Sequence, residues 1–460
     1  MKALIFIEHD VVIRHFVHSR VFAAFIAAHD VTFVFPEPNY KRVTMDVSTL
    51  DLGAPYRHLT VHQARLVIWK RLFQVDLLRW RPGTLFAALR TLHREMIGPK
   101  ATALYTVLSL PGIYKLFRLI SFARVRTIPF TELDLLIAEE APDILIHPSV
   151  LEGVYINDLV SASKATGIPL AVIMNSWDNP CTKRAMVGTP DWLLVWGPQT
   201  RKHAIDFVGM PPDRTLMFGA AQFDVYREPP RITRAEFCAR HQIDPGARIL
   251  LYAGSSKGTD EFAHLTAIEE AIDQGRLGNT VIVYRPHPWG LGGKGGERIL
   301  DHSWRHLRIE TSMQAYLESV RRGDTTMSFP DYRDTHDVLS SIDALVSPLS
   351  TIILEGALHN KPVLSFLPIE ETGARHFQLA LPLKHFEDMF NMPEFLVARG
   401  RAELIPGIKT LLSRLDDDDF AERSHKACAH FVASFDRPYG ERLVEFCESV
   451  AHIASPRKVA

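Results

Sequence analysis

The sequence predicts an α/β protein built from two doubly wound domains, each a parallel sheet covered by helices. Short apolar runs alternate with helical patterns along the chain, which is typical of β–α–β units. At 460 residues the chain is also too long for one ordinary core. The alternation breaks once, at "FGAAQFDVYREPP" (residues 218–230), and then restarts. Small residues and a double proline in that stretch indicate a domain boundary.

The first half of the chain supplies the first predicted sheet. Its helices are expected at 11–28 and at 152–166, where Gly167 ends the second. A long helical region lies between its second and third strands. The expected strands span residues 2–7, 31–35, 143–149, 169–177 and 191–197.

The second half repeats the pattern. Helices are expected at 260–274 and 350–359, and C-terminal helices from about Met392. The expected strands span residues 248–256, 280–288, 306–311, 344–348 and 361–366. We therefore expect a first domain at 1–225 with a basic helical insertion at about 60–126, a second domain at 226–430, and a terminal helix within 431–460.

Bulk composition excludes several classes of protein. The chain is 47% hydrophobic and 23% charged with a net charge of −1, which gives no reason to expect a polyanionic partner. Its four cysteines form no CxxC pair, so we expect neither a zinc knuckle nor a disulfide framework. Cysteines of this kind are typical of a reducing compartment, so we expect a cytoplasmic protein. The apolar N-terminus is too short for a signal peptide. Residues 102–122 are interrupted by Pro111, Lys115 and Arg118, so we expect no transmembrane helix.

Charge is concentrated in one segment. Residues 63–126 hold twelve Lys and Arg against Asp76 and Glu95, a net charge of +10 that leaves −11 for the rest. Aromatic and leucine residues interleave with these charges, as in basic amphipathic helices that lie on the inner face of an anionic membrane. The alternative is a helical layer with solvated basic residues. Nucleic acid is not expected as a partner, because no recognition motif accompanies the charge.

Polar residues that directly follow strands are the candidates for a ligand site. In doubly wound sheets the carboxyl ends of the strands converge on one edge, and ligands bind there. Such residues occur after strands in both halves of the chain, and the second half has three groups of them.

The first group precedes a predicted helix. Ser350 and Thr351 follow a strand that ends at Ser347, and free N–H groups at a helix start favour phosphate. Glu355 lies one turn further on, within reach of a ribose hydroxyl. Capping of the helix by Ser350 is the alternative that needs no ligand.

The second group is "YAGSSKGTDE". Gly254, Ser255, Ser256 and Gly258 allow a close backbone approach to phosphate, and Lys257 adds a positive charge. The spacing GxxxxGK[ST] is absent, so this is not a Walker loop. Many strand–helix turns have a similar composition.

The third group is "YRPHP". Pro286 and Pro288 stiffen the backbone on both sides of His287, which can donate a hydrogen bond to a phosphate oxygen. Arg285 can assist there, or it can face a neighbouring helix.

These motifs together resemble a known superfamily. "YRPHP" and the block from Asp343 to Glu355 are similar to the donor domain of GT-B glycosyltransferases and their polyol-phosphate-transferring relatives, nearest to CDP-glycerol glycerophosphotransferases and capsule polysaccharide transferases. "SWDNPCTK" with its continuation to "GAAQFDVY", and "FDRPYGERLVEFCESV", also resemble stretches of that group. The resemblance covers about residues 143–450, and residues 8–126 have no match, as expected for an acceptor-binding half.

The resemblance implies a GT-B fold, in which two Rossmann-like domains face each other across a cleft and a C-terminal helix crosses back. It implies that His287, Ser350 and Thr351 contact the donor phosphate, and that Glu355 contacts the nucleotide. The chain lacks the second glutamate of the retaining pattern ExxxxxxxE, so retention of configuration is not predicted. Neither a metal ion nor a cofactor is expected, because these groups take over the role of a metal.

The first domain is expected to supply the base. His9 and Asp10 follow the first strand, where inverting relatives often place it, and histidine titrates near neutrality. Glu8 or Asp10 can orient His9. The alternative is that these three residues only cap the next helix. Asp178, Asn179 and Lys183 are expected at the edge of the cleft, although Asn179 can equally be a turn residue.

The sequence therefore predicts a transferase that moves a sugar or polyol phosphate from a UDP-, CDP- or CMP-linked donor to a saccharide or lipid-linked acceptor of the cell envelope. Two alternatives remain. One is a sugar-nucleotide epimerase of the non-hydrolysing UDP-N-acetylglucosamine 2-epimerase type, which shares the fold. The other is a protein that binds a nucleotide sugar without catalysis.

Overall fold

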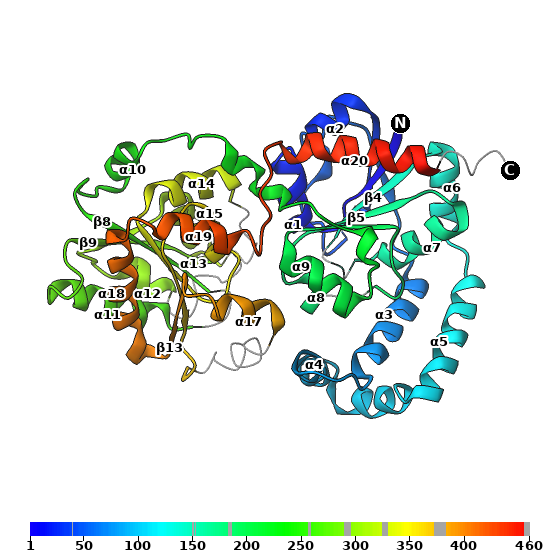
Figure 1. The fold of residues 1–460 in the computed structure, drawn as a ribbon, viewed down its shortest axis with the longest axis horizontal. Helices are drawn as coiled ribbons and strands as arrows, with labels where there is room; N and C mark the ends of the chain where they lie inside the picture. The colour runs from blue at the N-terminus through cyan, green and yellow to red at the C-terminus, as the bar shows by residue number, and fades with distance from the viewer. Residues whose placement is uncertain are drawn as a thin grey trace. The chain divides into compact units, whose positions relative to one another are not determined.

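A computed structural model of the chain describes residues 1–38, 40–149, 151, 153–182, 186–255, 259–288, 296–323, 330–371 and 383–454. The chain divides into two compact units, coloured along the sequence in Figure 1. Unit 1 comprises Met1–Asp224, Leu383–His385 and Phe431–Ala460, and unit 2 comprises Val225–Pro382 and Phe386–His430.

Unit 1 contains a sheet of seven parallel strands in the order β3-β2-β1-β4-β5-β6-β7. The chain starts in the middle of the sheet, builds outward to β3 and then resumes on the other side of β1, so the strand order reverses between β1 and β4. The strands are β1 (Lys2–Phe6), β2 (Asp30–Pro36), β3 (Tyr56–Leu59), β4 (Ile144–Ser149), β5 (Leu170–Met174), β6 (Trp192–Val195) and β7 (Thr215–Met217). Strands β1, β4 and β5 are almost wholly buried, in keeping with their continuous apolar runs.

Helices cover both faces of this sheet (Figure 1). The α-helices are α1 (Asp10–Val12), α2 (Ala23–Ala28), α3 (Gln63–Leu78), α4 (Thr84–Leu108), α5 (Pro111–Arg126), α6 (Thr131–Glu140), α7 (Ile156–Thr166), α8 (Asn179–Thr182), α9 (Pro198–His203) and α20 (Tyr439–Ala454). Unit 1 also contains two π-helical segments, η1 (Ile13–His18) and η3 (Ala204–Val208). Its 3₁₀ segments are η2 (Val47–Thr49), η4 (Pro212–Arg214) and η5 (Ala221–Arg227), and η5 continues into unit 2.

The first predicted helix, 11–28, is broken in the structure. It consists of α1, the π-helical turns of η1, and α2. Arg20 between η1 and α2 has a φ of 55°, a left-handed conformation that a continuous α-helix cannot contain. Wide π turns of this kind often occur beside functional sites.

Helices α3, α4 and α5 form a layer that extends away from the sheet of unit 1 (Figure 1). Within α4 the backbone leaves helical geometry at Gly98, just before Pro99. No single helix in the described ranges is long and apolar enough to cross a membrane. The part of α4 from Phe86 together with α5 reaches that composition only as a pair, and the pair is bent by 97°.

The terminal helix α20 packs on α2 within unit 1. Gly440 permits this close approach, since a Cβ there would lie 2.7 Å from the carbonyl oxygen of Val21. The Tyr439 N–H donates to Asp224 (2.8 Å), and Arg442 donates to the carbonyl oxygen of Phe218. The segments "GAAQFDVY" and "FDRPYGER" are therefore fastened to each other.

Unit 2 contains six parallel strands in the order β10-β9-β8-β11-β12-β13, and the order reverses between β8 and β11. The strands are β8 (Arg248–Ala253), β9 (Thr280–Arg285), β10 (Leu307–Ile309), β11 (Ala344–Ser347), β12 (Val363–Leu367) and β13 (Phe395–Arg399). The helices are α10 (Arg234–His241), α11 (Glu261–Asp273), α12 (Gly296–Asp301), α13 (Thr311–Arg321), α14 (Tyr332–Ser341), α15 (Ile352–Leu358), α17 (Lys384–Phe390), α18 (Arg401–Ser413) and α19 (Phe420–Cys428), with a 3₁₀ turn η6 (Arg414–Asp416). Of these, α17 begins within the short segment Leu383–His385 assigned to unit 1.

Three short strands were not predicted. β3, β7 and β13 are all at sheet edges, and β3 and β7 each have only one buried residue. β3 and β7 carry no apolar run that a sequence pattern can detect, whereas β13 (FLVAR) does contain one and was included in the expected C-terminal helices. The expectation of helices from Met392 onward is corrected by β13, and α18 begins only after it.

Candidate functional site

The point where the strand order reverses is the expected ligand site in each sheet. In unit 2 three strands end at the same level there. Ala253 of β8 pairs with Arg285 of β9, and Val346 of β11 pairs with Tyr252 of β8, so Ser347 is level with both strand ends. The chain that follows β9 and the chain that follows β11 thus emerge at one edge, with β8 between them.

Arg285 is the most informative residue at this edge. Its side chain is only 5% exposed, and Nη2 donates to Thr335 Oγ1 at 2.9 Å. Nη1 is buried and has no hydrogen-bond partner. Within the described part of the chain that contact with α14 is the one hydrogen bond of the Arg285 side chain, and no carboxylate neutralises the guanidinium. A buried, unpaired guanidinium destabilises a protein, so it indicates a position prepared for an anion.

His287 and the Ser350–Thr351 pair follow the two strands that flank β8. Pro286 is buried and His287 half-buried, so the histidine begins the chain segment beyond β9. Thr351 is the N-cap of α15, yet its hydroxyl makes no capping hydrogen bond. Capping by Ser350 is not observed either, since α15 begins at Ile352 and Thr351 occupies the cap position. Both hydroxyls are half-buried at the sheet edge.

Glu355 belongs to a cluster that the sequence did not reveal. Its Oε2 accepts a hydrogen bond from the hydroxyl of Tyr226, and its backbone carbonyl accepts one from His359 Nδ1 (2.7 Å). The Tyr226 ring packs against His359 and His336. Glu355 is therefore oriented by Tyr226, which lies 129 residues earlier in the chain.

The first two residues after β8, Gly254 and Ser255, contact a glutamate of the protein. A Cβ on Gly254 would lie 2.7 Å from the carboxylate of Glu261, so the glycine accommodates that side chain and not a phosphate. The Ser255 N–H donates to Glu261 Oε1 at 2.5 Å, and Tyr284 donates to Oε2. Burial raises the pKa of Glu261. The predicted contacts Ser256 and Lys257 lie outside the described residues.

The equivalent edge in unit 1 is occupied by the protein's own carboxylate. Glu8 follows β1 and accepts hydrogen bonds from the N–H groups of Val154 and Tyr155, at 2.8 and 3.1 Å, which precede α7. His147 Nε2 of β4 lies 3.3 Å from the same oxygen. Burial alone would raise the pKa of Glu8, but the charge and hydrogen bond of His147 and the two N–H donors outweigh it, so the pKa is lowered.

The predicted catalytic pair His9 and Asp10 is not assembled. Asp10 is buried, and its oxygens accept hydrogen bonds from Thr44 N–H, Thr44 Oγ1 and Met45 N–H, so it holds a distant loop and does not orient His9. His9 Nδ1 accepts a hydrogen bond from Val11 N–H (3.1 Å) as the cap of α1. In a neutral ring that accepts at Nδ1, the proton is on Nε2, so Nε2 cannot act as the base unless the cap is lost.

His15 is a second histidine of unit 1 that contacts a strand end, and no motif in the sequence marks it. It lies in η1, and its Nδ1 is 2.5 Å from Asn175 Oδ1, at the end of β5. An amide oxygen only accepts, so Nδ1 carries the proton and Nε2 has the basic lone pair. Burial, followed by the charge of Arg14, lowers the pKa of His15 to about 3, so the ring is neutral near pH 7. From sequence alone, His15 is recognisable only as a histidine in the predicted helix that follows the first strand.

The expected cleft-edge residues have mainly local contacts. Asn179 is fully buried; its Oδ1 accepts from Ser176 N–H and its amide donates to Asp178, which fits the turn alternative. Asp178 also accepts a hydrogen bond from the hydroxyl of Thr182. Lys183 lies outside the described residues.

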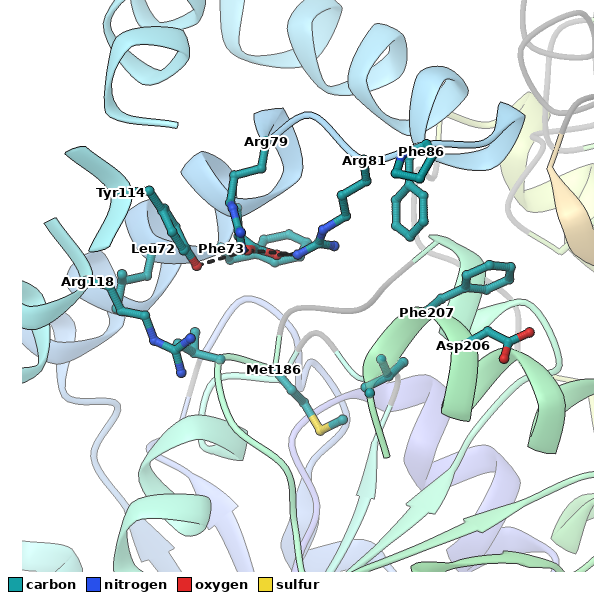
Figure 2. Close-up of a pocket in the computed structure, with 15 residues that line it drawn as sticks. Leu72, Phe73, Arg79, Arg81, Phe86, Tyr114, Arg118, Met186, Asp206 and Phe207 are labelled. Atoms are coloured by element: carbon teal, nitrogen blue, oxygen red, sulfur yellow. Dashed lines mark hydrogen bonds and ion pairs between the residues drawn. The ribbon is translucent and has the colours of Figure 1, made fainter. Parts of the chain in front are cut away.

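A separate cavity of about 450 Å³ lies within unit 1 (Figure 2). It is walled by α3, by the link to α4, by α5, and by two later segments of the unit. Its lining residues are Leu72, Phe73, Asp76, Arg79, Arg81, Pro82, Phe86, Tyr114, Arg118, Met186, Val187, Asp206, Phe207, Val208 and Gly209.

Asp76 organises the polar wall of this cavity. Its carboxylate accepts hydrogen bonds from Arg79, Arg81 and the hydroxyl of Tyr114, at 2.7 to 3.2 Å. One carboxylate between two guanidinium groups leaves a net positive charge, to which Arg118 adds (Figure 2). The opposite wall has the apolar side chains of Met186 and Phe207 and also the carboxylate of Asp206, which offsets one of the positive charges (Figure 2). The cavity therefore suits a ligand with both an anionic and an apolar part.

Comparisons with known proteins support the fold. No model of a protein family and no curated protein matches the sequence. Solved structures do match over nearly the whole chain. The Staphylococcus aureus MnaA–UDP complex has a TM-score of 0.54 at 10% identity, covering 98% of this chain and 97% of that one.

Two further structures are similar. The Neisseria meningitidis UDP-GlcNAc 2-epimerase bound to UDP-GlcNAc has a TM-score of 0.52 at 11% identity and covers 99% and 100% of the two chains. The Rickettsia bellii UDP-N-acetylglucosamine 2-epimerase has a TM-score of 0.52 at 11% identity, covering 98% and 97%. These similarities and the two strand orders confirm the predicted fold class, a GT-B fold of two doubly wound units. They give no support to the narrower resemblance to CDP-glycerol transferases.

Proposed function

We propose that this protein is an enzyme that binds a nucleotide-activated sugar or polyol at the carboxyl edge of unit 2 and transfers its glycosyl or polyol-phosphate group to an acceptor. The observation that carries the proposal is Arg285, a buried cation without an anionic partner among the described residues. A diphosphate supplies the missing charge, and the guanidinium suits its geometry.

The neighbouring groups have roles consistent with a nucleotide. His287, Ser350 and Thr351 lie at the same sheet edge and can donate to phosphate oxygens. Glu355, held by Tyr226, is suited to a ribose hydroxyl. Two of the similar structures were solved with UDP or UDP-GlcNAc, and we therefore take UDP as the first ligand to test.

The reaction is a displacement. The acceptor oxygen forms a bond to the anomeric carbon (or to the phosphorus of a polyol phosphate) as the bond to the departing nucleotide breaks, and the acceptor proton passes to a base. Arg285 and His287 stabilise the negative charge that develops on the leaving phosphate. The tautomer of His15 puts the lone pair on Nε2, as a base requires, whereas its pKa of about 3 makes it a weak base.

Transfer requires a second substrate site, which epimerisation of one nucleotide sugar does not. The cavity of unit 1 is a candidate acceptor site, since its arginines and apolar side chains suit a lipid-linked saccharide. This cavity is the reason to prefer transfer to the epimerase reaction named for the similar structures.

Incubation of the protein with UDP-, CDP- and CMP-linked donors separates the hypotheses. Transfer or slow hydrolysis releases nucleotide, epimerisation yields an isomeric sugar nucleotide without release, and a binding protein leaves the donor unchanged. We expect release. Arg285→Met should reduce kcat/KM at least about 100-fold, as loss of a charged transition-state donor does, whereas the exposed Arg276→Met should not. Epimer formation without nucleotide release would contradict transfer.

A further inference from the structure

The far half of α4 and helix α5 expose an unusual amount of aliphatic surface. Leu119 is 67% exposed, Leu116 58% and Leu104 57%. We call the exposed aliphatic residues of this segment the α4–α5 surface; they are Leu104 and Val107 of α4, Leu110 in the link, and Ile113, Leu116, Leu119 and Ile120 of α5. Isolated exposed leucines are ordinary, but a contiguous set on two consecutive helices marks an interaction site.

The helical periodicity shows that this surface is not misplaced core. Helix α5 turns Tyr114, Ser121 and Val125 inward, where Val125 joins a cluster with Ile68 and Trp69 of α3. Ile113, Leu116 and Ile120 recur on the outer side. Helix α5 is thus apolar on both sides, the pattern of a helix buried on both sides, although one side has no partner among the residues that the structure describes.

Basic residues surround the apolar ones. Lys115, Arg124 and Arg126 of α5 are exposed, as are Arg94 and Lys100 of α4. In the same two helices Glu95 is the one acidic residue. The occupant of the surface is therefore apolar and negatively charged.

We propose that the α4–α5 surface docks on an anionic lipid bilayer, with its aliphatic side chains in the acyl region and its basic side chains among the headgroups. A bilayer with acidic lipids combines the two required properties. A second copy of the chain does not, because a two-fold interface would bring the same basic surface against itself. The 97° bend between the helices favours lying in the interface over spanning it.

Docking also explains the position of the unit 1 cavity. Helix α5 contributes Tyr114 and Arg118 to that cavity, so a protein held on the membrane by α5 has the cavity close to the lipid surface. The docking itself does not depend on the proposed reaction.

Flotation with lipid vesicles tests the proposal. The full-length protein should bind vesicles of phosphatidylglycerol mixed with phosphatidylcholine, and bind less at high salt. The triple variant Leu116→Gln, Leu119→Gln, Ile120→Gln should lower the partition coefficient more than about tenfold, because three apolar side chains no longer leave water. The matched control Leu135→Gln, Met217→Gln, Ile369→Gln changes three exposed apolar residues elsewhere and should bind like the parent.

A second set of variants tests the charge. Lys115→Gln, Arg124→Gln and Arg126→Gln together should weaken binding and reduce its salt dependence. Arg276→Gln, Lys409→Gln and Lys426→Gln remove the same charge from exposed positions in unit 2 and should change neither. Equal thermal melting of all variants verifies that they fold.

Two results would overturn the proposal. One is a parent protein that does not bind anionic vesicles at low salt, or that binds them unchanged after the α5 substitutions. The other is a parent that is a dimer by light scattering and becomes monomeric with those substitutions, which would assign the surface to a second copy.

Discussion

The two sheets have the same strand order up to their sixth strands, and each carboxyl edge holds a buried glutamate, yet the group beside that glutamate differs. In unit 1 Glu8, after β1, accepts hydrogen bonds from the N–H groups before α7 and lies beside His147. In unit 2 Glu261 accepts the N–H of Ser255 after β8, and the neighbouring strand β9 ends in the buried guanidinium of Arg285 with Nη1 unpaired. Topology places a potential anion site in both units, and the local charge determines which unit can use it.

The same comparison explains two glycines. Gly153 in unit 1 and Gly254 in unit 2 each lie against a buried glutamate, Glu8 and Glu261 respectively. A glycine-rich turn after a strand therefore does not by itself indicate a phosphate site. In both turns the glycine makes room for a carboxylate of the protein.

The largest loss of stability is expected from removing the carboxylate of Glu8. Glu8→Ala leaves His147 and two N–H groups buried without their acceptor, which should cost about 3–5 kcal/mol. Native-state hydrogen exchange of β4 and α7 peptides measures this loss. The exposed Glu139→Ala on α6 is the control, and a loss below about 1 kcal/mol for Glu8→Ala would mean that Glu8 does not fill the edge.

The buried carboxylate of Glu371 in unit 2 is expected to make a smaller contribution to the free energy of unfolding, one that depends on pH. Glu371 pairs with His264 Nε2 at 2.5 Å and with Arg401 at 2.8 Å. Burial acts to raise its pKa, but the hydrogen bonds from His264 and Asp260 N–H, the charge of His264 and the Arg401 contact together lower it to about 2.

Because the folded-state pKa is lowered, the stability that Glu371 contributes is complete above about pH 4.5 and is lost as the pH falls toward 2. Glu371→Gln should cost about 3 kcal/mol near neutral pH and flatten the acid dependence of hydrogen exchange in β8 and β12 peptides. An unchanged acid dependence in the variant would show that other groups control it.

The two glycines give the smallest effects and a direct comparison of the turns. A Cβ at position 153 would lie 1.9 Å from Glu8 Oε1, against 2.7 Å between a Cβ at 254 and Glu261 Oε2. Each substitution by alanine should cost about 1–3 kcal/mol, with Gly153→Ala the more severe. Denaturation midpoints of the two variants test the order, and the reverse order would show that the Glu8 carboxylate can move aside.

The buried strands could be predicted from sequence because each is a continuous apolar run, as in "KALIF" and "VLSFL". Chain order also located the strand ends, and in the structure Arg285, His287, Ser350 and Thr351 lie at or after strands that end at one edge; their role in binding stays a prediction. The role of Asp10 could not be predicted, because its partner Thr44 is 34 residues away. Nor could the pairing of Tyr226 with Glu355, or the missing partner of Arg285, since both depend on three-dimensional contacts between separate elements.

The measurement that tests the central claim most directly is UDP binding by Arg285→Met, together with the unfolding free energy of the ligand-free variant. If Arg285 is prepared for a phosphate, its replacement by an apolar side chain of similar length weakens UDP binding about 100-fold or more while leaving stability unchanged or raised. Unchanged UDP binding, or a ligand-free protein destabilised by several kcal/mol, would contradict the claim and make Arg285 a structural residue.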